Sequence, residues 1–241
     1  MKYEAVTIKD IAKALGLSTS TVSRALRDSY EISPETKKIV IEYAQQINYR
    51  PNPIALSLKE KRSRSIGIIV CEIANSFFSQ AINGIESIAY DKGYNVIIAQ
   101  SHESYEREIL NLQYLASRSI DGLLISVSSE TENLDHLINL HKRGFPIVFF
   151  DRVVENLDTH KVGVDNYKGA YDATSELIKN GHQNIAMLAG SEFLSITKER
   201  VAGYHQALTD HKIAFDASQI EYCLHGGMNY QEVENALDNL I

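Results

Sequence analysis

Residues 17–27, LSTSTVSRALR, gather side chains whose hydrogen-bonding groups suit recognition of DNA. Thr19, Ser20, Ser23 and Arg24 fall on the outer side of a short predicted helix, near its N-terminus. Arginine can donate two hydrogen bonds to a guanine, and serine or threonine hydroxyls can bond to bases or phosphates. Free backbone N–H groups at a helix start also attract phosphate. These residue types at this spacing are suited to a helix tip that enters the major groove.

Two short helices joined by a tight turn must position this segment. Thr7 can cap the first helix, with Asp10 three residues later, and apolar residues recur on one face up to Leu15. Gly16 supplies a left-handed residue that ends this helix, and Ser18 is a good N-cap for the second. The pattern indicates a helix-turn-helix. The same spacing also fits an ordinary helical hairpin with a solvated polar face.

A third helix and a basic segment follow. Ser33 and Pro34 start the third helix, whose inner face is expected to carry Ile39, Tyr43 and Ile47. In YRPNPIALSLKEKRSRSIGIIV, the first proline ends this helix and the next asparagine can cap another, less than three turns long. Isolated helices of that length are unstable in water. We therefore expect a partner to order this segment.

Charge separates the first quarter of the chain from the rest. Residues 1–65 carry 12 Lys and Arg against 7 Asp and Glu, whereas the remaining residues carry 12 against 24. A basic head on an acidic body indicates a polyanionic partner for the head, although an imbalance of this size also arises by chance.

The chain lacks the patterns of several other protein classes. It has neither a membrane-spanning apolar run nor the apolar core of a signal peptide, which predicts a cytoplasmic location. Cys71 and Cys223 form no CxxC pair and are expected to be small core residues. No HExxH, P-loop or GxGxxG sequence occurs. We expect no catalytic residues, no metal site and no cofactor.

From residue 66 onward, strand and helix patterns alternate. Buried strands are predicted at SIGIIVCEI, NVIIAQ, DGLLISV, PIVFFD, NIAMLAG and IEYCL. Amphipathic helices are predicted near 77–92, 105–118, 132–142, 167–180 and 196–211, and MNYQEVENALDNLI is also a helix pattern. Such alternation predicts parallel sheets covered by helices.

Ligands of such sheets bind at the carboxyl ends of the strands. Polar and aromatic residues near those ends are Asn75, Phe77, Phe78, Ser128, Asp151, Arg152 and Asp165, with Arg200 in the helix after NIAMLAG. Aspartate and arginine can hold adjacent hydroxyls, and an aromatic ring can cover the apolar side of a sugar. The phenylalanines can equally belong to the core, and Asp165 and Arg200 can form a structural ion pair.

Three segments, TIKDIAKALGLSTSTVSRAL, ISPETKKIV and INYRPNPIALSL, strongly resemble the LacI/GalR family of bacterial transcription repressors. This resemblance implies base reading by Thr19, Ser20 and Arg24. It implies phosphate contacts by Thr7, Ser18, Thr21, Ser23 and Asn52. Residues 52–60 match the family's hinge helix, with Leu58 as the minor-groove wedge and Ala55 on the same side. Leu56 departs from the arginine that many members have after the hinge alanine.

In this family, the body is a two-lobed sensor that resembles periplasmic sugar-binding proteins and holds an effector between its lobes. The resemblance makes Phe78, Asp151, Arg152, Asp165 and Arg200 candidate effector residues, and Ser128 joins them from its position after a strand. Purine-binding members carry polar residues where this chain has Leu194 and Ile196. The resemblance therefore favours a sugar or sugar derivative over a purine.

The sequence thus predicts an α/β protein with a small all-α helix-turn-helix head, a hinge helix and a two-lobed sensor with parallel doubly wound sheets. The expected divisions are 1–50 for the head, 51–65 for the hinge and linker, 66–164 for the first lobe and 165–241 for the second. Family members continue beyond the position that matches Ile241, so the second lobe is expected to be incomplete.

The expected function is a repressor that binds near-palindromic double-stranded operator DNA as a homodimer or higher homo-oligomer. A small sugar-like effector would control it, and no membrane is involved. The alternative is a sugar-binding protein without sequence-specific DNA function. An enzyme would need a nucleophile–base pair or a phosphate loop, and the sequence shows neither.

Overall fold

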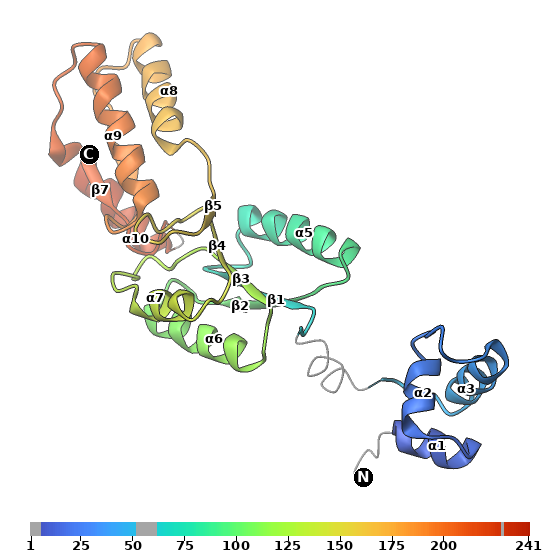
Figure 1. The fold of residues 1–241 in the computed structure, drawn as a ribbon. Helices are drawn as coiled ribbons and strands as arrows, with labels where there is room; N and C mark the ends of the chain where they lie inside the picture. The colour runs from blue at the N-terminus through green and yellow to red at the C-terminus, as the bar shows by residue number, and fades with distance from the viewer. Residues whose placement is uncertain (1–5, 52–61, 228) are drawn as a thin grey trace. The chain divides into compact units, whose positions relative to one another are not determined.

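The computed structural model describes residues 6–51, 62–227 and 229–241, and the chain divides into two compact units, Met1–Ser63 and Arg64–Ile241 (Figure 1). We call the first unit the head and the second the sensor. The proposed hinge residues Asn52, Ala55 and Leu58 lie outside the described residues.

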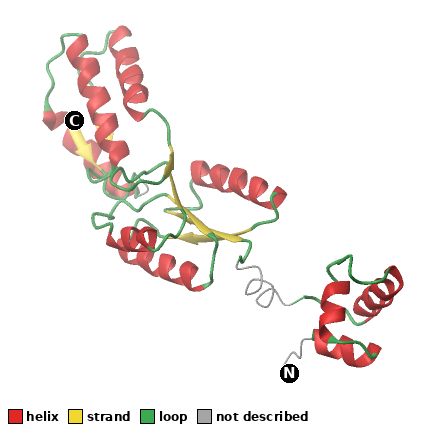
Figure 2. Cartoon of the chain, viewed as in Figure 1, coloured by secondary structure: helices red, strands yellow, loops and turns green. Residues whose placement is uncertain are grey.

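The described part of the head contains helices α1 (Ile8–Leu15), α2 (Thr19–Ala25) and α3 (Pro34–Gln46) (Figure 2). The Asp10 carboxylate accepts hydrogen bonds from Thr7 N at 2.8 Å and from Thr7 Oγ1 at 2.7 Å, which fixes the start of α1. Gly16 ends α1 with φ +65°, and Ser18 caps α2 by accepting a bond from Thr21 N at 3.0 Å. The predicted caps and turn are confirmed.

A small apolar core joins these three helices. Ile11, Val22, Ala25 and Val40 are fully buried. The prediction for the inner face of α3 was wrong at one position, because Ile39 is 48% exposed. Val40 and Ala44 line that face instead, with Tyr43 and Ile47 packed beside them.

The sensor begins with a five-stranded parallel sheet of order β2-β1-β3-β4-β5. Its strands are β1 (Ser65–Val70), β2 (Asn95–Gln100), β3 (Gly122–Ile125), β4 (Ile147–Phe150) and β5 (His160–Val162). The three exposed residues of β5 lack an apolar pattern, and the sequence did not predict this strand. The other four confirm predicted strands.

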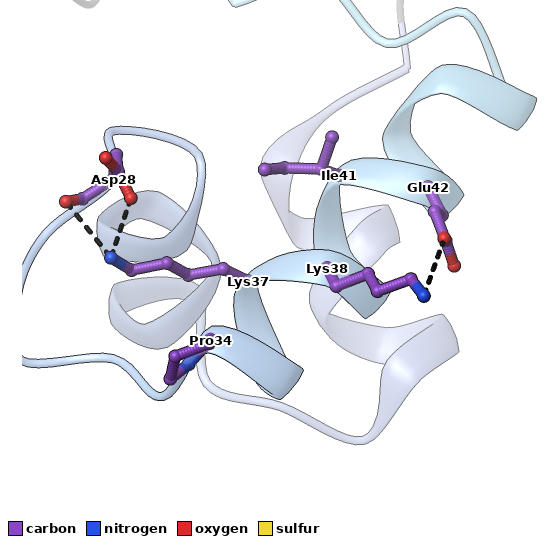
Figure 3. A pocket seen from close by; sticks show the side chains of 6 residues that line it. All are labelled: Asp28, Pro34, Lys37, Lys38, Ile41 and Glu42. Atoms are coloured by element: carbon purple, nitrogen blue, oxygen red, sulfur yellow. Dashed lines mark hydrogen bonds and ion pairs between the residues drawn. The ribbon is translucent and has the colours of Figure 1, made fainter.

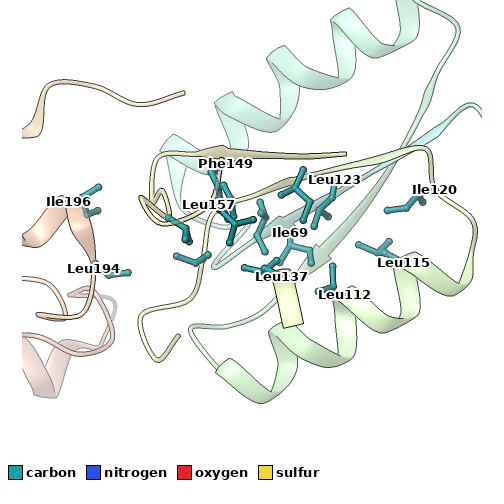
Figure 4. Close-up of a cluster of buried hydrophobic side chains, with 14 residues drawn as sticks. Ile69, Leu112, Leu115, Ile120, Leu123, Leu137, Phe149, Leu157, Leu194 and Ile196 are labelled. Atoms are coloured by element: carbon teal, nitrogen blue, oxygen red, sulfur yellow. The ribbon is translucent and has the colours of Figure 1, made fainter. Parts of the chain in front are cut away.

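Helices cover both faces of this sheet (Figure 1). On one face, α5 (Ser76–Asp91) packs Phe78 and Ile82 against Ile68 and Val70. On the other face, α6 (Tyr105–Ser117) and α7 (Asp135–Lys142) pack on the larger apolar core shown in Figure 4. The strands β1, β3 and β4 are therefore buried on both sides, which explains their continuous apolar sequences.

The rest of the sensor carries a two-stranded parallel sheet and three α-helices in its described part. The elements are α8 (Asn166–Lys179), β6 (Met187–Ala189), α9 (Ser195–Asp210), the 3-10 helix η1 (Ala217–Gln219), β7 (Ile220–Tyr222) and α10 (Tyr230–Leu240). Helices α8 and α9 approach closely at Gly203, where an added Cβ would lie 2.2 Å from Tyr167 O. No helix in the described ranges is both long and apolar enough to span a membrane.

Candidate nucleic-acid interface and ligand site

The head displays the predicted DNA-reading side chains on the outer side of α2. Val22 and Ala25 point into the core, so Thr19, Ser20 and Arg24 remain exposed. Thr7 and Ser18 are exposed too, whereas Thr21 and Ser23 are half-buried. All seven described candidates of the head therefore lie on α2 or at the N-caps of α1 and α2.

Several hydroxyl groups of this surface already have hydrogen-bond partners within the head. Ser18 Oγ lies 2.7 Å from Ser20 Oγ and 2.8 Å from Thr21 Oγ1. Arg27 donates to Ser23 O and to Ser23 Oγ, each at 3.0 Å. These local bonds orient the side chains, and some must exchange before the hydroxyls contact a nucleic acid.

Arg24 has an acidic partner that the sequence did not indicate. Its Nη1 lies 2.9 Å from Glu31 Oε2, and the two side chains are 53% and 45% exposed. Glu31 lies beyond the end of α2, in the connection to α3. Helical periodicity does not reach such a residue, so only the folded turn reveals the pair.

In the sensor, Asp151 and Arg200 form one part of the candidate ligand site. Asp151 follows β4 in a left-handed conformation with φ +59°, and Ser126 Oγ donates to its Oδ2 at 3.4 Å. Burial raises the pKa of Asp151 above its ordinary 3.8, although the charges of Arg152 and Arg200 act in the opposite direction. Arg200 Nε donates to Asn166 Oδ1 at 2.9 Å.

Arg152 is buried and held by a carboxylate from the β2–α6 connection. Its Nη1 and Nη2 donate to the two oxygens of Glu103 at 2.6 and 2.8 Å, and Nη1 also donates to Val127 O at 3.2 Å. Arg152 Nε is buried and has no hydrogen-bond partner among the described residues. Gly226, after β7, lies close by, since a Cβ there would be 3.3 Å from Arg152 Nη2. The pair therefore joins the connection after β2 to the segment after β4, with Gly226 beside it.

The Cys71 thiol also lies at this ion pair. Arg152 Nη1 is 3.1 Å from Cys71 Sγ, and burial raises the pKa of the thiol far above its ordinary value. Cys71 and Cys223 are both buried and free, which confirms their predicted place in the interior.

Three other predicted ligand residues make contacts that stabilise the fold. Ser128 is fully buried, and its Oγ donates to Ser101 Oγ at 2.8 Å. Phe78 packs edge to face on Phe150 in the core. Asp165 Oδ1 accepts from Lys168 N at 2.8 Å and caps α8. Their contact with a ligand stays a prediction.

Asn75 and Phe77, the other two residues noted after β1, lie at the start of α5. Asn75 Oδ1 accepts from Phe77 N at 2.8 Å and caps α5, and Phe77 is 51% exposed. Among the described residues, no hydrogen bond joins Asn75 or Phe77 to Arg152 or to its partners.

Sequence reasoning missed two buried glutamates. Glu103 holds Arg152 and accepts a bond from Ser129 N at 2.9 Å. Glu108 is fully buried and accepts from Ser128 N at 2.6 Å and Thr131 Oγ1 at 3.1 Å. Both carboxylates therefore fix the segment that follows β3.

Leu194 and Ile196 have packing roles that their sequence position did not reveal. Both are buried in the large apolar core with Val154 and Leu157 (Figure 4). Ser195 Oγ between them donates to Val153 O at 3.0 Å. The start of α9 is thus attached to the connection after β4. Their apolar character follows from this packing, and its bearing on ligand choice stays a prediction.

Comparison with known proteins assigns both units to described families. Residues 7–52 match "Bacterial regulatory proteins, lacI family". Residues 63–241 match "Periplasmic binding proteins and sugar binding domain of LacI family".

Two curated relatives illustrate the similarity. The HTH-type transcriptional repressor PurR of Vibrio campbellii is 33% identical over 97% of this chain and 69% of its own length. The catabolite control protein A of Priestia megaterium is 31% identical over 98% and 70%. The chain spans about two thirds of the length of these relatives.

Solved structures share the fold. A lac repressor dimer bound to operator and the anti-inducer ONPF has a TM-score of 0.79, at 26% identity, over 98% of this chain and 71% of its own. A transcriptional regulator CelR–cellobiose complex has a TM-score of 0.64, at 26% identity, over 98% and 70%.

Proposed function

Because the chain belongs to the LacI family of bacterial regulatory proteins, we propose that it represses transcription by placing α2 in the major groove of an operator. The observation that carries this proposal is the outer face of α2. A short capped helix, anchored by fully buried Val22 and Ala25, presents Thr19, Ser20 and Arg24 to solvent. A rigid helix with small hydroxyls and one guanidinium suits direct reading of base edges.

The remaining head residues have supporting roles in this proposal. Thr7, Ser18, Thr21 and Ser23 would contact phosphates, because their hydroxyls lie beside the reading residues or at helix starts. The hinge roles of Asn52, Ala55 and Leu58 rest on the resemblance alone, since these residues lie outside the described ranges.

The regulator would act as a dimer on a near-palindromic site. The similar lac repressor structure is a dimer bound to operator. A two-fold dimer places two copies of α2 on symmetric half-sites. In the sensor, an apolar groove lined by Ile66, Ile85 and Ile88 runs beside α5 and offers a surface for the second copy.

A sugar or sugar derivative is the proposed effector, at the site built by Asp151, Arg152 and Arg200. Glu103 accepts one hydrogen bond from each of the two terminal nitrogens of Arg152. Arg152 Nε–H and the second N–H of Nη2, which lie side by side, are then the donors proposed for two adjacent ligand oxygens. The Glu103 carboxylate neutralises Arg152, which favours an uncharged ligand. The similar CelR structure contains cellobiose.

The effector would couple the two units without chemistry of its own. We propose that it changes DNA affinity by shifting the two lobes, that the chain has no catalytic activity, and that it works in the cytoplasm. The relatives described above are regulators by name.

Selection from a random pool of duplex DNA tests the proposal. The full chain should enrich a near-palindromic motif, and candidate sugars should raise or lower binding to that motif but not to scrambled DNA. In Arg24→Ala, base choice should relax at one position in each half-site. Enrichment of no motif would show that the head does not read sequence, and would favour a sugar-binding protein without this function.

A further inference from the structure

The ion pair between Arg24 and Glu31 places a negative charge beside the proposed base-reading arginine. A carboxylate at a DNA-facing surface opposes binding to phosphates. What Glu31 does depends on two facts: what holds it in place, and which donors of Arg24 it leaves free.

Bonds other than the ion pair hold the Glu31 segment. Ser29 N donates to Arg24 O at 3.0 Å, and Ile32 N donates to Ser29 O at 3.3 Å. Lys37 from α3 donates to Asp28 O at 3.2 Å and to Asp28 Oδ1 at 2.6 Å, as the dashed lines in Figure 3 show. The connection from α2 to α3 is thus fixed by its backbone and by Lys37. An exposed ion pair adds little to stability, so loss of the Glu31 charge should leave the head folded.

Glu31 engages only one end of the Arg24 guanidinium. The contact is made by Nη1 at 2.9 Å, and among the described residues Nε and Nη2 of Arg24 have no hydrogen-bond or ion-pair partner. Guanine presents two acceptors, O6 and N7, to a pair of adjacent donors. The Nε–Nη2 edge supplies such a pair while Nη1 stays on Glu31. The carboxylate can therefore remain bound to Arg24 while the arginine reads a base.

We propose that Glu31 is a specificity-determining positioning residue that orients Arg24 toward a base and opposes its use on phosphates. This inference rests on the proposed function. Non-specific binding depends on cations that displace counterions from phosphates. An arginine paired with a carboxylate contributes little to that displacement. Arg24 then adds affinity at a matching guanine and little on any other sequence, which raises the ratio of specific to non-specific binding.

The variant Glu31→Gln tests this proposal in the full chain. Two duplexes serve as probes: the site selected by the unaltered protein and a scrambled version of the same composition. The variant should bind the scrambled duplex about three- to tenfold more tightly, with a salt dependence steeper by about one phosphate contact. Affinity for the selected site should change less than twofold. A repeated selection should show weaker base preference at the position read by Arg24.

A matched control separates this role from net charge. Glu42→Gln makes the same charge change in α3, where Glu42 pairs with Lys38 at 3.9 Å (Figure 3). It should leave the ratio of the two affinities unchanged. In an Arg24→Ala background, Glu31→Gln should no longer alter base preference, because the proposed effect passes through Arg24.

The outcomes distinguish the inference from the proposed function. Equal effects of Glu31→Gln and Glu42→Gln on both duplexes would overturn the inference, because Glu31 would then act only as a charge. An unchanged base preference in Glu31→Gln, with a motif still enriched, would also overturn it and leave the proposed function intact. No enriched motif with the unaltered protein would refute the proposed function itself.

Discussion

The polar groups of the head and of the sensor are held in opposite ways. In the head, exposed side chains bond to partners two to nine residues away, as Ser18 does with Ser20 and Asp28 with Lys37. In the sensor, buried side chains bond across the sheet, and Arg152 lies 49 residues from Glu103 and 81 from Cys71. A surface built from neighbours in sequence is visible in the sequence, whereas a buried site built from distant segments is not.

This contrast also has energetic consequences. Exposed hydroxyls exchange hydrogen-bond partners with water at little cost, so the head can present them to DNA. A buried charge has no such replacement, and the loss of its partner destabilises the fold. Loss of a charged partner should therefore cost more stability in the sensor than in the head, and the measured stability changes test this difference.

The largest effect is expected for Glu103→Gln. This change leaves the buried Arg152 guanidinium without its counter-charge, and we expect the sensor to lose about 3–5 kcal/mol of stability. Hydrogen exchange of the β1, β3 and β4 amides, measured apart from the amides of the head, reports this loss. The exposed-pair variant Glu42→Gln should change head stability little. Similar losses in the two variants would remove the proposed difference between the units.

The same ion pair predicts a dependence on pH. Burial by itself raises the pKa of Glu103, but the hydrogen bonds and charge of Arg152 outweigh it and leave the pKa below its ordinary 4.5. A carboxyl with a depressed pKa stabilises the folded state above its unfolded pKa, and this contribution disappears as pH falls through the folded value. The stability difference between the unaltered chain and Glu103→Gln should therefore be constant at neutral pH and shrink below about pH 4.5.

A second large effect is expected where α8 and α9 meet. In Gly203→Ala, the new Cβ would lie 2.2 Å from Tyr167 O, so the helices must separate. We expect a loss of about 3 kcal/mol, in the range of severe overpacking. Gly169→Ala in α8 is the matched control, because no atom lies within 4 Å of its new Cβ. The control should be neutral or slightly stabilising. If hydrogen exchange of the α8 and α9 amides were the same in Gly203→Ala as in the unaltered chain, the two helices would not approach as closely as described.

A smaller effect is expected at the turn of the head. Gly16 has φ +65°, and nothing lies within 4 Å of an added Cβ, so Gly16→Ala adds backbone strain alone. The cost should be about 1 kcal/mol, measured from the exchange of the α1 and α2 amides. Gly16→Asn should cost less, because asparagine tolerates the left-handed region. Equal costs for the two variants would show that the strain does not arise from φ.

The head was largely predictable from sequence because its determinants are local. Caps at Thr7, Ser18 and Ser33 and the left-handed Gly16 follow from residue type and spacing. The error at Ile39 arose because α3 has apolar residues on neighbouring positions, and only packing decides that Val40 faces the core. Glu31 was missed because the chain turns after α2, where Asp28 has a positive φ, so helical spacing does not relate Glu31 to Arg24.

The sensor was predictable as a fold but less so as a site. Continuous apolar strands indicated a parallel sheet, whereas β5 has no such pattern. The rule that ligands bind at the carboxyl ends of parallel strands predicted that Asp151 and Arg152 lie at one edge of the sheet. It did not predict that Ser128 is fully buried. Glu103 lies in the connection after β2 and Glu108 in the first turn of α6, where polar residues are common, and only their partners on distant segments give them a role.

The smallest effect, and one of opposite sign, is expected for Asp151→Asn. Burial raises the pKa of Asp151 above 3.8, so the ionised carboxylate is less favourable in the folded chain than in the unfolded one. Asparagine has the same shape and tolerates φ +59°, so it removes the charge without new strain. We expect a gain in sensor stability of about 1 kcal/mol or less at pH 7.

The pH dependence of this gain identifies its cause. A carboxyl with a raised pKa costs stability only when ionised, so the cost is fully present above the folded pKa and vanishes as pH falls below the unfolded value near 3.8. The advantage of Asp151→Asn should therefore disappear in acid, in the same range where the contribution of Glu103 is lost. A residue that is kept at a cost to the fold is a candidate for function, and sugar-dependent changes in DNA binding should weaken in this variant. If Asp151→Asn instead destabilised the sensor at pH 7, the attraction of Arg152 and Arg200 would outweigh burial, and Asp151 would belong with Glu103 as a structural carboxylate.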